Sequence, residues 1–586
     1  MKISKYLNKG LSIFVVSSAL LIGSVLFSEE SAYAESSAEV AWKMPRDGAL
    51  GDHIFTLPGE PIGDIRSYLY RSNFISMVDK EDPSCTSFSD IKCSGTQFSY
   101  RATIPICDAT TIVDCINTLE ISENSGAQQK AEFLGYFPKK NQNSFTGDAE
   151  AGIPTGASGS LFQFINKSGN KEIYFVAAMV DGGGVKNAHS RYAIESRVYK
   201  VRQVPASYSP GSKDNGIVKV DNEQVWAGMP MGTYIWQSPG YYENLNCIVT
   251  SVSESSCLER LKLTSDVRIT LNLRLKSIPN GWMHGRLLDP TISIEETTKY
   301  KSVTVSANPI SVPVYYKNFR WNEMPTQIRE KYDSKTGIYI GGEIGFGAYS
   351  PPNTDPMKRS IIIDPPAYSV QASDQLNLWL PFTGDRATAE QTMWNFHTLT
   401  SQESFGANKC FTSAEKVTGI VSTNSATYSA GPPEFDSASE SLNYKVSAPH
   451  FSSSGDLFKG SYDLIMSEDV SKCLYGFAGA TAKATISVTT TEGSQQVATT
   501  SFSNEGGWMH LSAKGFSFSS PTIKIKLSKQ DSAKVELPKI ELIPEKADSV
   551  GVIKKISITC TKGKAIKKVT AVNPKCPAGY KMKTLK

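Results

Sequence analysis

Alternating apolar and polar residues dominate the chain and predict β-strands. Residues 267–276 (VRITLNLRLK) alternate without a break, which is typical of a strand with one buried and one solvated face. Residues 523–527 repeat this alternation. Residues 173–180 instead form a continuous apolar run, which predicts a strand covered on both faces. The three glycines at 182–184 follow that run, and we expect them to form a loop.

Helical patterns are few. Pro325 is suited to a first helical position, so residues 325–332 are the best helix candidate. Residues 377–382 (NLWLPF) read as another buried strand. Many short strands punctuated by Gly and Pro favour antiparallel sandwiches. We therefore expect a mainly β, multi-domain protein, with tandem antiparallel β-sandwich modules and a small basic C-terminal hairpin.

An internal repeat supports the tandem arrangement. The sequence Gly-Trp-Met-His occurs at 281–284 and again at 507–510, and a chance second copy has a probability on the order of 10⁻⁴ at this composition. We infer two divergent copies of one β-module, with Trp282 and Trp508 at equivalent buried positions, and interpret these residues as core packing rather than a binding site. Flanking motifs keep the same order in both copies: Gly-Thr-Tyr at 232–234 and Gly-Ser-Tyr at 460–462, Cys-Leu at 257–258 and 473–474, Pro-Thr-Ile at 290–292 and 521–523.

These patterns divide the chain into six segments. They are a signal peptide (1–34), an N-terminal β-rich domain (35–215), β-sandwich module copy 1 (216–315), a connecting region with a short helix (316–405), β-sandwich module copy 2 (406–545), and a linker with a basic, disulfide-clipped tail (546–586).

The N-terminus has the pattern of a secretory signal. Lysines at 2, 5 and 9 precede an apolar stretch at 11–27, and Ala32-Tyr33-Ala34 fits a cleavage site that gives a mature start at Glu35. An uncleaved membrane anchor is the rival interpretation, although the apolar stretch is at the short limit for crossing a bilayer. The sequence thus predicts a secreted or cell-surface protein.

All ten cysteines follow the signal segment, and an even number in an exported chain favours disulfides. A metal site is disfavoured because the chain has no Cys-x-x-Cys and no His near a Cys pair. Spacing alone does not fix the connectivity, but we predict pairing between neighbours, including one long-range pair. The predicted pairs are Cys85 with Cys93, Cys107 with Cys115, Cys247 with Cys257, Cys410 with Cys473, and Cys560 with Cys576.

The C-terminal residues resemble a known module. Residues 558–564 (ITCTKGK), 567–570 (KKVT) and 575–581 (KCPAGYK) are similar to the C-terminal module of secreted proteins of freshwater actinobacteria. Motifs of the body resemble the same proteins, and they lie at 408–411, 431–433, 460–464, 472–477 and 497–500. The resemblance implies export and a surface location, and it supplies no catalytic residues.

The sequence contains no catalytic motif of good specificity, so we predict no catalytic, cofactor-binding or metal-ligating residues and no cofactor. Ser158 lies in a Gly-Ser turn without the context of a serine nucleophile, and the six histidines are scattered. A phosphate-binding loop and a dinucleotide fingerprint are both lacking. A secreted hydrolase remains the alternative, with a paired-carboxylate glycosidase the least excluded form.

The charge distribution points to the tail. Residues 551–586 contain ten lysines and no Asp or Glu, whereas the rest of the chain after the signal segment is net acidic. Such a tail attracts anionic cell-wall polymers or lipid head groups, and its alternative role is to solubilise the chain. Nucleic acid is not expected, because Tyr580 is the only aromatic residue there. The lysines are Lys554, Lys555, Lys562, Lys564, Lys567, Lys568, Lys575, Lys581, Lys583 and Lys586.

The leading functional hypothesis is therefore a non-enzymatic secreted or cell-surface β-protein. Its β-modules would act in adhesion, envelope structure or ligand binding, with a ligand that the sequence does not identify.

Overall fold

The computed structural model forms two compact units, residues 1–530 and 531–586. It describes residues 52–57, 65, 67–71, 85–90, 97–139, 144–185, 188–205, 207–209, 217–220, 223–226, 247–251, 254–279, 281–332, 346–348, 361–364, 368–399, 407–412, 416–476, 482–489, 495–496, 498–518, 522–529, 556–562, 565–571, 576 and 579–582. The predicted signal segment lies outside the described residues. The described helices are too short or too polar to span a bilayer.

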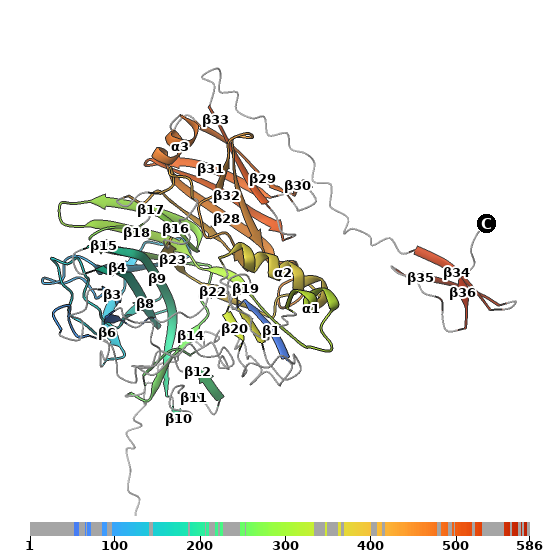
Figure 1. The fold of residues 1–586 in the computed structure, drawn as a ribbon, viewed down its shortest axis with the longest axis horizontal. Helices are drawn as coiled ribbons and strands as arrows, with labels where there is room; N and C mark the ends of the chain where they lie inside the picture. The colour runs from blue at the N-terminus through green and yellow to red at the C-terminus, as the bar shows by residue number, and fades with distance from the viewer. Residues whose placement is uncertain are drawn as a thin grey trace, which may run out of the picture. The chain divides into compact units, whose positions relative to one another are not determined.

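The described residues are mainly β, as predicted, and the first unit is built around one large sheet (Figure 1). Its main path runs in the order β2 (Tyr68–Arg71), β3 (Gln97–Thr103), β8 (Lys171–Val185), β9 (Ala188–Pro205), β23 (Asn395–Thr398), β16 (Trp282–Arg286), β24 (Gly419–Thr423), β28 (Lys459–Ser467), β32 (Trp508–Ser517) and β31 (Thr499–Glu505). Beside this path, β7 (Gly159–Ile165) joins β8 to β6 (Glu132–Phe137), and β14 (Ser256–Leu261) joins β9 to β13 (Cys247–Ser251).

A second sheet covers one face of the large sheet and completes the first sandwich. Its order is β17 (Leu288–Glu296), β18 (Lys301–Asn308), β15 (Val267–Leu275), β4 (Cys115–Glu123) and β5 (Gln129–Lys130). The predicted alternation is confirmed in β15, where Ile269, Leu271 and Leu273 are fully buried in the first core. That core also takes Val176 and Ala178 from β8 of the large sheet.

A third sheet packs on the large sheet through a separate core and forms the second sandwich. Its order is β25 (Thr427–Tyr428), β27 (Ser441–Ser447), β33 (Thr522–Lys529), β29 (Ala482–Thr489) and β30 (Gln495–Gln496), with β26 (Glu434–Asp436) beside β27. Ile523 and Ile525 of β33 face Leu464 and Leu511 of the large sheet in this second core.

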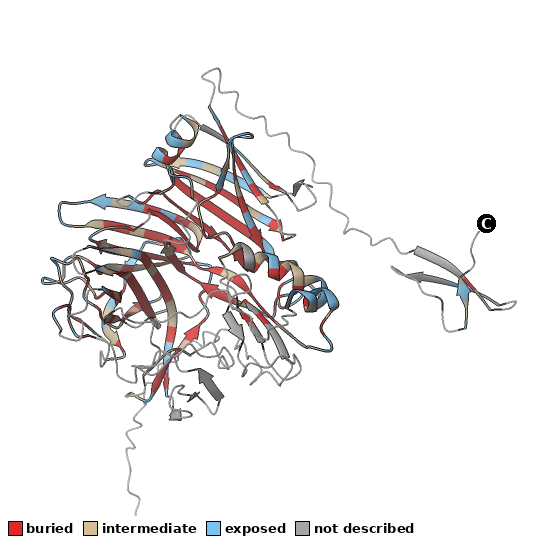
Figure 2. Ribbon diagram, in the orientation of Figure 1, coloured by how far each residue is buried: buried red, intermediate tan, exposed pale blue. Residues whose placement is uncertain are grey.

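Three adjacent strands serve both cores, because successive strand residues point to opposite faces of a sheet. In β16, Trp282 enters the second core while Met283 enters the first. In β24, Ile420 and Val421 divide in the same way, as do Ile465 and Leu464 in β28. The sandwiches are joined where β16 pairs with β24 in parallel. The two cores thus lie on opposite faces of one continuous, mostly buried sheet (Figure 2).

Two smaller sheets complete the first unit. One has the order β20 (Phe346–Ala348), β21 (Ile361–Asp364), β1 (Asp52–Leu57), β19 (Ile310–Arg320) and β22 (Ala389–Met393). The other consists of β10 (Ser207–Ser209), β11 (Ile217–Val220) and β12 (Glu223–Trp226). The described helices are α1 (Thr326–Tyr332), as predicted after Pro325, α2 (Val370–Thr383) and α3 (Glu468–Tyr475).

Helix α2 corrects the prediction of a strand over residues 377–382. Ser369 caps its N-terminus, with its hydroxyl accepting the N–H of Ala372 at 3.0 Å. Ala372, Leu376 and Trp379 recur at helical spacing and are all fully buried in the second core. Gly384 ends the helix with φ 81°, the left-handed conformation common after helices.

The glycines at 182–184 also differ from expectation, since β8 continues through them as a strand. A Cβ on Gly182 would lie 2.4 Å from the Tyr100 hydroxyl, and one on Gly183 would lie 2.6 Å from the Phe98 carbonyl oxygen. These glycines therefore permit the close approach of β3. Glycine in a strand interior often marks such a close approach of another backbone.

The expected module boundaries do not separate independent sandwiches. Strand β15, from residues 216–315, pairs with β4 of the expected N-terminal domain, and β14 pairs with β9. The first sandwich thus draws on both 35–215 and 216–315. Sequence patterns reveal strands but not their partners, because pairing joins residues far apart in the chain.

The two Gly-Trp-Met-His motifs share a local conformation rather than an environment. Gly281 and Gly507 both have positive φ, at 55° and 81°, and each Trp begins the following strand. Trp282 is fully buried in the second core, whereas Trp508 is only partly buried and packs against the first. The expectation of equivalent buried positions is therefore wrong.

Candidate functional site

The C-terminal unit contains the predicted hairpin. Strand β34 (Ile556–Lys562) pairs antiparallel with β35 (Ala565–Ala571), and the disulfide Cys560–Cys576 lies in the same unit. Cys560 is fully buried. A third strand, β36 (Lys581–Met582), pairs with β34 and was not predicted. The disulfide suits so small a unit, because few residues bury too little surface to be stable alone.

Four of the predicted tether lysines lie among the described residues of this unit, and all four are exposed to solvent. They are Lys562, Lys567, Lys568 and Lys581. The other predicted tether residues, Lys554, Lys555, Lys564, Lys575, Lys583 and Lys586, lie outside the described residues. The exposed lysines come from all three strands of the sheet, so the unit presents ammonium groups from each of them.

The disulfide predictions are confirmed where both cysteines are described. Cys107–Cys115, Cys410–Cys473 and Cys560–Cys576 are bonded. Cys85 and Cys257 are also disulfide-bonded, but the predicted partners Cys93 and Cys247 are not described in enough detail to establish these two pairs. Among the described cysteines none is free.

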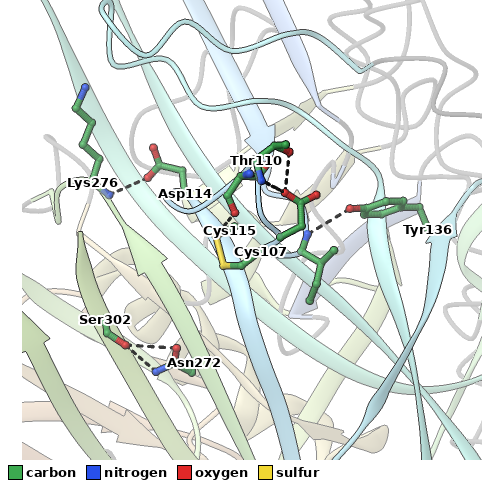
Figure 3. The surroundings of a disulfide bond; sticks show 11 residues. Cys107, Thr110, Asp114, Cys115, Tyr136, Asn272, Lys276 and Ser302 are labelled. Atoms are coloured by element: carbon green, nitrogen blue, oxygen red, sulfur yellow. Dashed lines mark hydrogen bonds between the residues drawn. A yellow bond between two sulfur atoms is a disulfide. The ribbon is translucent and has the colours of Figure 1, made fainter. Parts of the chain in front are cut away.

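The Cys107–Cys115 disulfide lies beside Asp114, the residue before β4, which bonds to the backbone of Lys276 (Figure 3). Asp114 has a positive φ of 53° and accepts the backbone N–H of Lys276 at 2.9 Å. Its carboxylate also pairs with Arg191 at 2.6 Å, and both side chains are nearly buried. Through these contacts Asp114 links the start of β4 to β9 and to the residue after β15. We therefore interpret the contacts as stabilising the fold.

A buried polar cluster, which sequence reasoning missed, lies near the junction of the two sandwiches. His284 of β16 and His397 of β23 are directly opposite in register, with ring centroids 3.5 Å apart. His284 Nδ1 lies 2.8 Å from the Tyr428 hydroxyl, and the Arg286 guanidinium lies over the Tyr428 ring. Glu195 of β9 is opposite His397 on its other side.

Burial controls the protonation of this cluster. It lowers the pKa of His397 to about 4, against the opposing attraction of Glu195. It also holds the pKa of His284 well below the usual value, with His397 acting in the same direction. Burial alone would raise the pKa of Glu195, but Arg197 and Arg101 lower it to about 2. Both imidazoles are therefore neutral at pH 7, while Glu195 is ionised.

The cluster does not form a metal site, since no group of three or more His, Cys, Asp or Glu residues among those described could hold an ion. The described carboxyl groups with shifted pKa values are Asp108, Glu195 and Asp436, and all three are lowered. A glycosidase acid requires a raised pKa. The described residues thus supply no observation that favours the hydrolase alternative.

Comparison with known proteins gives no family assignment: no protein-family model matches the chain, and neither curated proteins nor solved structures gave a match.

Proposed function

We propose that this is a non-catalytic cell-surface protein, exported through its N-terminal segment and held to anionic cell-wall polymers by its basic C-terminal unit. The body then acts in adhesion, envelope structure or ligand binding. The observation that supports the proposal best is the C-terminal unit, which is compact by itself, disulfide-bonded, and exposes lysines from each of its strands. Its resemblance to the C-terminal module of secreted actinobacterial proteins agrees with this role.

Electrostatics accounts for the tether. Ten lysines without a compensating carboxylate in residues 551–586 create a strongly positive unit, which attracts a polyanion. The remainder of the mature chain is net acidic and would be repelled by the same surface. Exposed charges are screened by salt, because the Debye length falls from about 10 Å at 0.1 M to about 3 Å at 1 M.

Retention on cells tests the tether. The lysines at 562, 567, 568 and 581 are replaced together by Gln, and the matched control replaces four exposed body lysines, Lys130, Lys262, Lys299 and Lys409. We expect the tail variant, and a variant lacking 553–586, to move from the cell fraction to the medium. The wild type should follow at high salt, while the control stays bound.

Equal retention of the tail variants and the control would contradict the tether. Retention on intact cells but not on isolated walls would indicate lipid head groups as the partner instead. Both fractions are measured by immunoblot.

A further inference from the structure

A polar groove lies at one end of the first sandwich, where three chain segments meet. These are the turn after β4, the turn before β15 and the end of β18 (Figure 1). The groove has a volume of about 440 Å³, which lies within the range of ligand-binding pockets, roughly 300–1,000 Å³. In other sandwiches the binding loops also gather at such an end.

The floor of the groove is held rigidly by hydrogen bonds. Arg268, on β15, donates from Nε to the Ser306 hydroxyl at 2.9 Å and from Nη1 to Oδ1 of Asn308 at 3.0 Å. Asn308 in turn donates from Nδ2 to the carbonyl oxygens of Ser265 and Val267 at 2.9 and 3.0 Å. Polar groups fixed on strands in this way are preorganised, so little ordering remains to oppose binding.

The rim of the groove carries polar side chains that make no hydrogen bond to the rest of the described structure. The side chains of Asn124, Ser125 and Asp266 are exposed and hydrogen-bond to no other described residue. Asn124 and Ser125 also have positive φ values of 50° and 56°, a conformation that Asn adopts readily but that costs a residue such as Ser125 roughly 1–2 kcal/mol. The Asn124 N–H bonds to the Asp266 carbonyl oxygen at 2.8 Å and joins the two turns. Such strain is often retained at ligand-binding sites.

The lining chemistry selects the class of ligand. The lining holds one carboxylate, Asp266, and one guanidinium, Arg268, so its formal charge is zero, and the remaining lining residues are Asn, Gln, Ser and Gly. The set offers both donors and acceptors, which matches hydroxyl groups that do both. An anion would meet Asp266, and a cation would meet Arg268. Calcium needs six to eight oxygen ligands, which a single carboxylate does not anchor.

From this combination we propose that the groove binds a neutral saccharide unit. The inference deepens the ligand-binding role of the body and so rests on the proposed function, but it uses none of the tail residues. The absence of aromatic residues from the lining implies recognition by hydrogen bonds alone, and therefore modest affinity.

An array of neutral and acidic oligosaccharides tests the site with the full chain. We expect binding to at least one neutral saccharide, followed by titration calorimetry with that sugar. Asp266→Ala should weaken binding at least about tenfold, since hydrogen bonds to charged groups contribute about that much. Glu434→Ala, an equally exposed carboxylate on the second sandwich, should leave it unchanged. Matching thermal unfolding curves exclude misfolding.

The site would be overturned if no neutral saccharide bound, or if the Asp266→Ala variant bound with unchanged affinity. Binding confined to acidic glycans and lost in the tail variant would also overturn it, while supporting the tether. Binding at the groove by a protein that is not retained on cells would support the saccharide site and contradict the tether. The two proposals can therefore fail independently.

Discussion

Replacing Trp282 by Ala should be among the most destabilising single changes in the chain. The indole is fully buried in the second core, where it packs edge-to-face on Phe411 with ring centroids 5.1 Å apart. It also lies over Gly419, whose Cβ, if present, would be 2.4 Å from the indole Cζ3 atom. Removal of a large buried aromatic costs about 3–5 kcal/mol through lost burial and the cavity that remains.

The matched control is Trp508→Ala, which changes the same side chain in the same sequence motif. Trp508 is only partly buried, so its loss should cost less than about 2 kcal/mol, because less apolar area returns to water. Urea unfolding, followed by circular dichroism with the disulfides intact, gives both free energies. With a slope near 2–3 kcal/mol per M, the Trp282 variant should shift the midpoint by about 1–2.5 M. Equal losses for the two variants, or a Trp282 loss under about 1 kcal/mol, would refute the assignment of Trp282 to a closed core.

Three further predictions concern protonation, cross-linking and backbone conformation. The depressed pKa values of His284 and His397 mean that the unfolded chain binds more protons below pH 6.5, so stability should fall as the pH drops from about 6.5 to 4, by at most about 1.4 kcal/mol per pH unit for each histidine. Urea midpoints across this range measure the slope, which His397→Gln should reduce; an unchanged slope would contradict the burial of that ring. Removing the Cys410–Cys473 disulfide with a double Ala variant should cost about 4 kcal/mol, since the bond closes a long loop with a sequence separation of 63; a thermal unfolding curve that matches the wild type would reject this. Gly507→Ala should cost about 1–2 kcal/mol because φ is 81° there, and Gly507→Asn should cost less; equal effects in urea unfolding would argue against the left-handed conformation.

Local patterns predicted the strands whose signal lies within one segment. Strand β15 alternates along its own length, and α1 begins directly after a proline. Residues 377–382 misled because their apolar run matches a strand, and the helical spacing emerges only when Ala372 and Leu376 are counted with Trp379. The helix could therefore be recognised only from a longer segment that begins at its N-cap, Ser369.

The candidate sites likewise differ in whether their residues are close together in the sequence. The C-terminal hairpin could be predicted because its strands, turn and cysteines are neighbours in sequence. The His284–His397 contact could not, since it depends on the register of strands separated by more than a hundred residues. The saccharide groove likewise requires Asn124, Asp266 and Asn308 to meet, and nothing in any one segment signals that meeting.

The position of β1 has a consequence for the order in which the chain acquires its structure. This strand pairs His53 with Phe319 of β19 and with Ile361 of β21, so it is made first but its partners are made much later. Ribosomal synthesis proceeds from the N-terminus, so the segment waits unpaired while more than two hundred and fifty residues follow it. Such distant closure is slow, and an unpaired strand is open to wrong partners. Pairing of β1 with its neighbours therefore cannot begin until β19 has been made, and a nascent chain truncated before residue 310 would hold β1 without either of its neighbours.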